Sequence, residues 1–417
     1  MLMGVTDSVM IGRLGKIPLA ASSFANAIWG MAFMTGIGLL IPVAVLVSRS
    51  HGAGRDGEAG DWLRHGMALG LAIGAMTTGA LFALAGELHR FGQPAEVVAE
   101  IRPYFDLIAA SMIPTLVFQV LRQFSESLGR PWMPMAIMLA GVGLNIGLNW
   151  IFIYGHLGVP AFGLAGAGWA TLTARTLGVA VIWMGLKRAP DIRAAWPRAW
   201  VTGFETARFR EMLAFGVPAA GTLLFESGAF TVAALMMGWI SATALAAHQI
   251  AISCAAFTFM FPLGLSMAVS MRIGRAVGEG RHAALRPIGF GAQLLSAMVM
   301  GTFALVFALA GPYLAAGFVT EESVIRLASQ LLVVAAVFQL GDGGQVVAAG
   351  ALRGLADVKV PTLITFLAYW GIAIPGAYFA GVAGPLGALG VWVALAVGLM
   401  VAAVLLNLRY ARMTVRL

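Results

Sequence analysis

Charged side chains are scarce in this sequence of 417 residues. Asp, Glu, Lys and Arg make up 11% of it and apolar residues 60%, whereas an average soluble domain carries about 25% charged residues. Each of its five long uncharged stretches exceeds the roughly 20 residues that cross a bilayer as a helix. The sequence therefore predicts a polytopic α-helical membrane protein, with no nucleic-acid partner despite a net charge of +8. The uncharged stretches are residues 17–48, 131–174, 227–271, 287–320 and 360–408.

Cysteine and several functional signatures are also nearly absent. The single cysteine, Cys254, lies in an apolar stretch and excludes a disulfide framework or a cysteine-built zinc site. Residues 1–10 lack a basic flank and a small-residue cleavage site, so we expect no cleaved secretory signal. Neither His-Glu-x-x-His nor Gly-x-Ser-x-Gly occurs. We therefore expect no enzyme, no catalytic residues and no cofactor.

Charged and Gly/Pro-rich breaks divide the chain into expected membrane helices. Turns such as Gly158-Val159-Pro160 and Gly384-Pro385-Leu386-Gly387 fall inside the long uncharged stretches and predict short hairpins there. The result is an all-α fold with twelve transmembrane helices. We expect them at residues 1–14, 18–48, 64–86, 102–123, 133–154, 163–186, 211–238, 242–271, 286–310, 322–352, 360–380 and 385–408.

Basic residues give the expected orientation. Most of the 26 lysines and arginines fall in loops that follow even-numbered helices, and Lys and Arg stay on the cytoplasmic side. We therefore expect both termini in the cytoplasm and the protein in the bacterial inner membrane, in contact with anionic lipids. The expected domains are an N-terminal lobe (1–187), a cytoplasmic linker (188–210), a C-terminal lobe (211–408) and a cytoplasmic tail (409–417).

The two lobes repeat in sequence. An offset of 226 places Leu19–Arg55 on Leu245–Arg281 without a gap, with 13 of 37 positions identical. A weaker match at an offset of 227 sets 129–134 against 356–361. Because each half contains an even number of helices, both enter the membrane from the same side, which predicts a parallel repeat about an axis along the membrane normal. Such a pair of six-helix bundles leaves a central cleft between two lobes, which is the geometry of an alternating-access transporter.

The first expected helix is short. At the offset of 226, about sixteen residues equivalent to Glu211–Glu226 have no counterpart before Met1. At 1.5 Å per residue this helix rises only about 21 Å, less than the roughly 30 Å hydrocarbon core. Either the chain begins inside a longer helix, or a half-helix dips into the membrane and leaves a thinned region beside it.

Three acidic residues fall inside expected membrane helices: Asp7, Glu226 and Asp342. A charged carboxylate at mid-membrane costs at least about 2.5 kcal/mol, and such residues commonly handle ions or protons. A neutral or paired carboxyl kept for packing is the alternative. We expect all three to take part in cation or proton coupling, with Glu226 and Asp342 sharing one site that binds H⁺ or Na⁺.

Other residues of the same helices are candidates for the lining of a central cleft. Polar side chains there can also serve interhelical hydrogen bonds, and aromatic ones can serve packing or form a soft wall for apolar cations. Arg175 is the basic residue that falls well inside an expected helix. The cleft candidates are Asn26, Trp29, Gln119, Asn145, Asn149, Phe225, His248, Gln249, Phe338 and Gln345.

An Arg-x-x-Gly-x-Gly motif occurs twice, at residues 49–54 and 275–280. It superficially resembles a phosphate-binding loop, but it follows the end of an expected membrane helix and no strand precedes it. Glycine at a helix C-terminus caps the helix by adopting a left-handed conformation. We therefore expect capping rather than phosphate binding.

Several segments together resemble the multidrug and toxic compound extrusion (MATE) family, in its NorM-like branch, over essentially the whole chain. Each segment alone is weak, but the combination is specific. The branch is indicated by Glu226 together with Asp342. The segments are Asp7–Gly15 with Leu19–Ala21, Asn145–Gly155, Pro160–Ala167, Ala246–Ala251, Met260–Gly264 and Gly350–Gly354.

The resemblance implies twelve helices in two six-helix bundles that form a V, and export of cationic drugs and dyes in exchange for Na⁺ or H⁺. It implies that Glu226 and Asp342 form the cation site of the C-terminal lobe and that Asp7 is a functional carboxylate of the N-terminal lobe. Some Na⁺-coupled relatives carry a tyrosine one turn before the aspartate, where this chain has Phe338. Because Phe338 lacks the hydroxyl that could bind Na⁺, this difference favours H⁺ as the coupling ion.

The function expected from these observations is secondary active multidrug export by alternating access. The expected partners are small organic cations and membrane lipids, and we expect a monomer. Two alternatives remain open: a lipid-linked oligosaccharide flippase of the same superfamily, and a membrane receptor or scaffold without transport. The flippase predicts a strongly cationic cleft, and the receptor leaves the buried acids unexplained.

Overall fold

The computed structural model describes residues 2–91 and 94–416, and this part of the chain is helical and contains no β-strand. Eleven of its helical segments are long and apolar enough to cross a membrane. The shorter α1 precedes them where the first of twelve helices was expected, and it covers 11 residues. The predicted all-α membrane fold is therefore confirmed.

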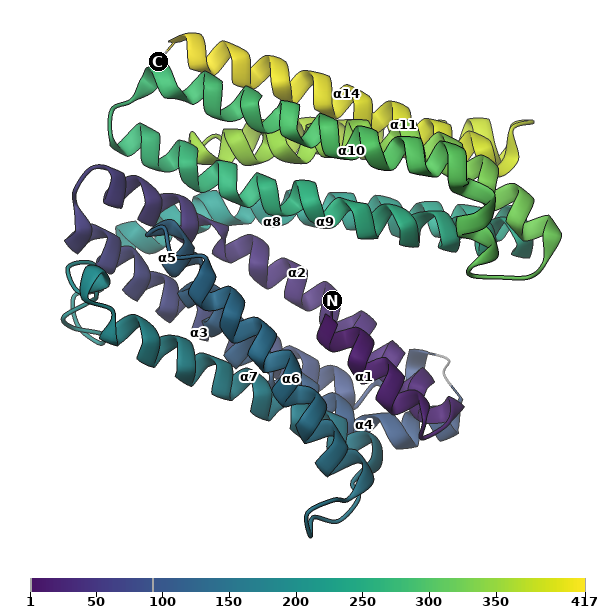
Figure 1. Cartoon of the computed structure of the whole chain (residues 1–417), viewed down its shortest axis with the longest axis horizontal. Helices are drawn as coiled ribbons and strands as arrows, with labels where there is room; N and C mark the ends of the chain where they lie inside the picture. The colour runs from purple at the N-terminus through teal and green to yellow at the C-terminus, as the bar shows by residue number, and fades with distance from the viewer. Residues whose placement is uncertain (1, 92–93, 417) are drawn as a thin grey trace. The chain divides into compact units, whose positions relative to one another are not determined.

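Helices α1 to α7 make up the first half of the chain (Figure 1). The span expected at 102–123 is divided at Ser111 into α4 and α5, because Pro114 follows and removes a backbone donor. The bounds are α1 Leu2–Gly12, α2 Lys16–Gly52, α3 Asp56–Ala85, α4 Ala95–Ala110, α5 Met112–Ser127, α6 Trp132–Tyr154 and α7 Gly163–Arg188, with short 3₁₀ turns η1 at Leu88–Phe91 and η2 at Pro190–Ile192.

Helices α8 to α14 make up the second half, where the span expected at 360–380 is irregular. It contains two π-helical stretches, η4 and η5, on either side of Pro375, and π-helical turns are common at functional sites. The bounds are α8 Thr206–Ile240, α9 Ala242–Gly278, η3 His282–Ala284, α10 Leu285–Ala316, α11 Glu322–Gly354, α12 Lys359–Phe366, η4 Leu367–Ala373, α13 Ile374–Ala377, η5 Tyr378–Val382 and α14 Gly387–Arg416.

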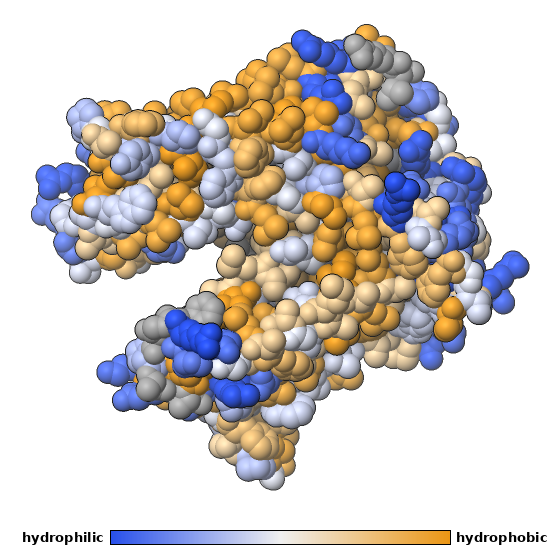
Figure 2. All heavy atoms as spheres, turned by 180° about the vertical axis from the view of Figure 1, so that it is seen from behind, coloured by the Kyte–Doolittle hydropathy of each residue, from blue (hydrophilic) through white to orange (hydrophobic). Residues whose placement is uncertain are grey.

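The chain forms two compact units. Unit 1 contains residues 1–47 and 55–216, and unit 2 contains residues 48–54 and 217–417. Each has an apolar core, in which Phe124 is fully buried in unit 1 and Trp392 in unit 2. Large apolar side chains also cover the outward helix faces in Figure 2, as expected for helices in contact with lipid tails.

The sequence repeat is visible in the helix boundaries. Helices α2 and α9 each contain 37 residues, and both their first residues (16 + 226 = 242) and their last residues (52 + 226 = 278) are related by the same offset. The segment 95–127 of α4 and α5 corresponds to α11 at an offset of 227 (95 + 227 = 322, 127 + 227 = 354). The duplicated plan inferred from the sequence therefore extends to helix length.

The repeated Arg-x-x-Gly-x-Gly motif ends α2 and α9. Gly54 and Gly280 adopt left-handed φ values of 70° and 69°, which confirms the predicted capping role. Gly52 and Gly278 serve another purpose, which the sequence did not reveal. A Cβ atom on Gly52 would collide with the carbonyl oxygen of Arg275, and one on Gly278 would collide with that of Arg49. The ends of α2 and α9 are thus in reciprocal backbone contact within unit 2.

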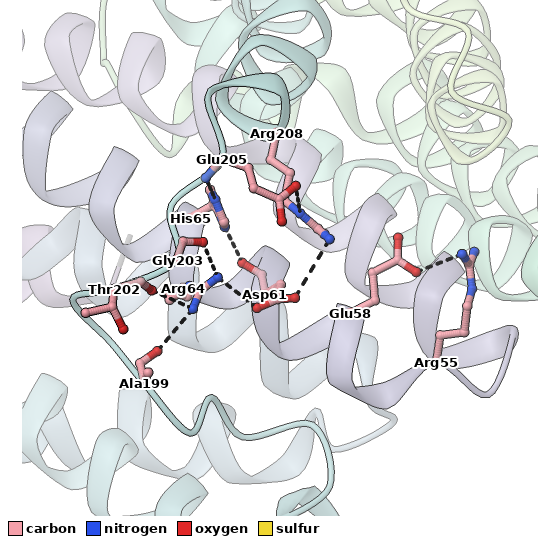
Figure 3. A network of polar contacts seen from close by, with 10 residues as sticks. All are labelled: Arg55, Glu58, Asp61, Arg64, His65, Ala199, Thr202, Gly203, Glu205 and Arg208. Atoms are coloured by element: carbon pink, nitrogen blue, oxygen red, sulfur yellow. Dashed lines mark hydrogen bonds and ion pairs between the residues drawn. The ribbon is translucent and has the colours of Figure 1, made fainter.

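The segment between α7 and α8 is tied to α3 by the network of Figure 3. The Arg64 guanidinium donates to the carbonyl oxygens of Thr202 at 2.7 Å and Gly203 at 2.6 Å. The buried His65 ring accepts the backbone N–H of Glu205 through Nε2 at 2.9 Å, while its Nδ1 faces the Asp61 carbonyl at 2.7 Å. Arg64 and His65 therefore tie the predicted linker, which belongs to unit 1, to helix α3.

Candidate functional site

The polar centre of unit 1 surrounds Asp7 of α1. Asn149 of α6 donates to Asp7 Oδ1 at 2.6 Å, and the Thr171 hydroxyl of α7 donates to Oδ2 at 3.4 Å. Asn149 also contacts Asn145 Oδ1 at 3.2 Å, one turn earlier on α6. All four side chains are buried, with Asn145 and Asn149 inaccessible and Asp7 7% exposed. The spacing of Asn145 and Asn149 by four residues places both amides on one face of α6, toward Asp7.

The remaining candidates of unit 1 are Asn26, Trp29 and Gln119. Asn26 is exposed on α2 and donates to the Tyr104 hydroxyl at 3.1 Å. Trp29 is buried beneath the guanidinium of Arg175, whose Cζ lies 4.2 Å from the ring centroid. Gln119 is buried on α5. Of the polar residues proposed for a cleft in this unit, the structure brings only Asn145 and Asn149 into the hydrogen-bonded cluster of Asp7.

The polar centre of unit 2 joins α8, α11 and η4. The Gln345 amide donates to Glu226 Oε1 at 3.4 Å and to the Tyr369 hydroxyl at 3.2 Å. Asp342 lies three residues before Gln345 on α11, so the two side chains share a helix face. Gln345 is 3% exposed and Tyr369 is fully buried. The structure thus collects two carboxyls, an amide and a phenol in one cluster.

One atom of this cluster lacks a partner. Asp342 Oδ1 is buried, and no group among the described residues forms a hydrogen bond with it. A buried carboxylate oxygen without a donor is costly unless a proton or a cation reaches it. The described residues contain no group of three His, Cys, Asp or Glu side chains that could hold a metal ion. The oxygens present fit a proton or one monovalent cation, since transporters hold such ions with carboxylates and other oxygens.

Other candidates of unit 2 serve packing in this structure. Phe338, 1% exposed, has ring contacts with Phe230 and Trp392. His248 accepts a hydrogen bond from Trp392 Nε1 at 3.1 Å. Phe225 packs against Phe366, while its carbonyl accepts the Trp370 indole N–H. Gln249 is exposed. Phe338, His248 and Phe225 thus contact aromatic side chains, and Gln249 is exposed.

Three polar residues escaped the sequence reasoning. Thr171 and Tyr369 are uncharged, so nothing marked them among the other hydroxyl residues of the helices. Arg353 falls just outside the helix expected at 322–352, yet it lies within α11, is 8% exposed, and donates to Ser266 Oγ at 2.6 Å. Each of the three residues reaches its partners from another span, so no spacing along the chain marks it.

Two surface features carry no comparable chemistry. A hollow of about 510 Å³ lies along α1 and α2, lined by Gly4, Val5, Ser8, Val9 and Leu19. A small cavity of about 10 Å³ lies beside Arg353, between Thr222 and Thr362, at the lower limit for one water. The hydroxyls of Thr222 and Thr362 are 2.9 Å apart and link α8 to α12.

Long apolar helices in two repeated halves, each with a carboxyl-centred polar cluster, define a polytopic membrane transport protein. The MatE family model matches residues 1–151 and 218–379. The chain is 35% identical to the probable multidrug resistance protein NorM of Bradyrhizobium diazoefficiens over 424 residues, 99% of this chain and 89% of the relative. It is 34% identical to the multidrug resistance protein PmpM of Pseudomonas aeruginosa over 433 residues, 98% of this chain and 87% of that protein.

Solved structures agree in fold. A MATE structure in a bent conformation superposes with a TM-score of 0.91 at 22% identity, covering 100% of this chain and 91% of that one. An outward-facing MATE family transporter gives 0.89 at 22% identity, covering 100% and 92%. The chain belongs to the MatE family, as the sequence resemblance indicated, and it is therefore a multi-span transporter rather than an enzyme.

Proposed function

We propose that this protein is a secondary active exporter of organic cations that exchanges its cargo for H⁺ or Na⁺ by alternating access. The observation that supports this function is the buried pair of carboxyls in unit 2, Glu226 and Asp342, with Asp342 Oδ1 left without a hydrogen-bond donor. Relatives of similar length are named multidrug resistance proteins. A cation-binding cluster inside a transporter gives a reason for the buried acids that a receptor or scaffold does not.

The exchange follows from competition for negative charge. When a proton or Na⁺ occupies the cluster, the repulsion between Glu226 and Asp342 is relieved and the site is nearly neutral. When the ion leaves, the cluster regains its affinity for a cationic cargo. Because the cluster holds one ligand at a time, binding of the ion on one side of the membrane promotes release of the cargo on that same side, and the ion is then carried across in the other direction.

We propose protons as the coupling ion. Phe338, one turn before Asp342, packs among aromatic rings and offers no oxygen. Tyr369 supplies one hydroxyl to the cluster, but that hydroxyl already accepts from Gln345. A proton needs a single acceptor oxygen, such as the unpartnered Oδ1 of Asp342, whereas Na⁺ needs several oxygen ligands at once.

We also propose that the protein is a monomer of the bacterial inner membrane, with both termini in the cytoplasm. Basic residues at the ends of α2, α7, α9 and α11 support this orientation. The cargo is then collected from the cytoplasm or the inner leaflet, and anionic lipids contact the basic helix ends.

Efflux of a cationic dye from cells tests the function. Glu226→Gln and Asp342→Asn remove one charge each while keeping the shape of the side chain, and we expect both to reduce efflux to the background of cells without the protein. The matched control is Glu322→Gln, because Glu322 is an exposed acid at the start of α11. Undiminished efflux by both variants, at equal amounts of folded protein, would refute the proposal.

The coupling ion is tested separately in reconstituted vesicles. A pH gradient and a Na⁺ gradient are imposed one at a time, and dye uptake is followed at fixed membrane potential. We expect uptake with the pH gradient alone. Uptake driven by Na⁺ at fixed pH would overturn the assignment of protons and leave exchange itself intact.

A further inference from the structure

The last residues of the linker before α8, residues 199–205, are held to α3 by polar side chains, and we name them the strap (Figure 3). The linker before the strap is anchored differently. Trp196 packs against Trp183 with a ring-centroid distance of 5.1 Å. The backbone of Ala195 lies so close to α3 that a Cβ atom on Gly60 would meet its carbonyl oxygen at 2.5 Å. These contacts carry no charge, whereas the strap depends on a histidine.

That histidine, His65, is fully buried and uses both ring nitrogens. The backbone N–H of Glu205 can only donate, and it reaches Nε2 at 2.9 Å. The backbone carbonyl of Asp61 can only accept, and it lies 2.7 Å from Nδ1. The bound ring is therefore neutral, with its proton on Nδ1. The rings of Phe204 and Phe209 pack against it at centroid distances of 5.4 and 4.9 Å and hold it in this orientation.

A second proton on this ring finds no acceptor. The charged groups around His65 are Asp61 and Arg64 on α3, Glu205 in the strap and Arg208 on α8. Both carboxylates are engaged, because Asp61 pairs with Arg64 at 2.9 Å and Glu205 pairs with Arg208 at 3.1 Å. A proton on Nε2 would face the Glu205 N–H, donor against donor. A buried donor without an acceptor is costly, so protonation breaks the bond between the ring and the strap.

The strap leads directly into α8. This helix begins at Thr206, and its residues up to Gly216 belong to unit 1, whereas those from Val217 onward belong to unit 2. The strap therefore fixes the unit 1 end of a helix that continues into unit 2. In the orientation proposed above, the strap and His65 lie on the cytoplasmic side.

We propose that His65 is a proton-operated latch: the neutral ring holds residues 199–205, and protonation at Nε2 from the cytoplasm releases them and slows exchange. This inference rests on the function proposed above and adds its regulation. Histidine is the side chain that ordinarily changes its charge between pH 5 and 8. Because only the released strap accepts the proton, a fall in pH shifts the population toward release. Proton import acidifies the cytoplasm, so the latch limits further import.

Backbone hydrogen exchange of the purified protein in lipid nanodiscs tests the latch without transport. The measured rates are corrected for the intrinsic pH dependence of amide exchange. We expect the strap of the wild type to exchange about tenfold faster at pH 5.5 than at pH 7.5, because loss of a bond of about 1.4 kcal/mol changes an equilibrium by that factor.

Two histidine variants separate the latch from other effects of acid. His65→Gln keeps an acceptor oxygen for the Glu205 N–H but does not titrate, so its strap should stay protected at both pH values. His282→Gln is the matched control, because His282 is an exposed histidine in η3, and it should respond as the wild type does. A strap equally protected at both pH values in the wild type, or one that loosens in acid in His65→Gln, would overturn the inference.

A variant on the strap side serves if His65→Gln does not fold. Glu205→Pro removes the donor N–H, so the strap should be unprotected at pH 7.5 and should not change further in acid. Glu205→Ala loses the carboxylate but keeps the N–H, and it should retain the response of the wild type. A pH response that persists in Glu205→Pro would contradict the latch.

Exchange of rhodamine 6G in vesicles tests the regulation. The pH is lowered equally on both sides, so that the pH difference and the driving force stay constant. At the acid end we expect the wild type to be about tenfold slower than His65→Gln, the factor set by the released fraction. Equal slowing of both would overturn the regulatory role. Absence of any exchange by the wild type, with a strap that still responds to pH, would instead contradict the proposed function.

Discussion

The polar clusters of the two units differ although the helices around them repeat. Asp7 in unit 1 receives hydrogen bonds from Asn149 and Thr171, whereas Asp342 in unit 2 keeps a buried oxygen with no donor among the described residues. The repeat does not copy these acids. At the offset of 226 Asp7 corresponds to Ala233, and at 227 Asp342 corresponds to Thr115. Duplication thus preserved the helices, while substitutions placed different side chains around the acids of the two units.

The two repeats share the reciprocal backbone contact between α2 and α9. Substitutions in this contact should cause the largest loss of stability. Gly278→Leu would place a side chain against the Arg49 carbonyl, and such overpacking costs about 3 kcal/mol. We expect a similar loss from Gly52→Leu, measured as lower thermal unfolding temperatures in detergent. Gly264→Leu in α9 is the control, because its Cβ would meet open space. Different outcomes for Gly52 and Gly278 would show that the contact is not reciprocal.

The next largest effect on stability is expected in the polar cluster around Asp7. Asn149→Leu removes the 2.6 Å donor to Asp7 and leaves a buried carboxyl oxygen unpaired, at a cost of about 1–3 kcal/mol. We expect a lower unfolding temperature. Asn407→Leu in α14 is a control, since the Asn407 amide donates only to backbone carbonyls. Equal stability of Asn149→Leu and the wild type would mean that the Asp7 cluster is not held by this bond.

A smaller effect, on function rather than stability, is expected in the cluster of Glu226 and Asp342. Tyr369→Phe removes the hydroxyl that accepts from Gln345 beside Glu226. We expect the apparent affinity for the coupling cation to fall about tenfold, or about 1.4 kcal/mol, as measured by dye uptake against ion concentration. Tyr378→Phe in η5 is the control, because Tyr378 is 44% exposed. An unchanged affinity would exclude Tyr369 from the cation site.

The smallest effect concerns the residue between the two glycines of each Arg-x-x-Gly-x-Gly motif. Hydrogen bonds from Arg275 and Arg281 lower the pKa of Glu279 below its usual 4.5, whereas the first repeat has Ala53 at this position. A lowered pKa stabilises the folded state above the unfolded value and loses that contribution as pH falls through the folded one. Glu279→Ala should therefore lower the unfolding temperature slightly at pH 7, and the difference should vanish in acid. A difference that persists at low pH would contradict this cause.

The membrane fold was predictable because lipid imposes simple rules. Helices in hydrocarbon must satisfy their own backbone groups and must be apolar for about 20 residues, so uncharged stretches located the spans, while the observed helices extend up to eight residues beyond the expected ends, as at Asp56 of α3 and Arg416 of α14. The repeat was visible for the same reason, since Leu19–Arg55 and Leu245–Arg281 retain their glycines and arginines without a gap. The break at Ser111 and the π-helical stretches of η4 and η5 were missed, because they depend on how single backbone bonds are rearranged around proline.

The acids of the candidate site were also apparent from the sequence, since a charge inside an apolar helix is rare and costly. By itself the sequence determined the class of protein, the all-α membrane fold, the duplication and the positions of Asp7, Glu226 and Asp342 inside the expected helices. Only the tertiary structure decided which partners these acids have. Contacts from Thr171, Tyr369 and Arg353 depend on helix rotation and packing between segments far apart in sequence. The structure alone shows that Asp7 receives two hydrogen bonds, whereas Asp342 keeps an oxygen without a donor among the described residues.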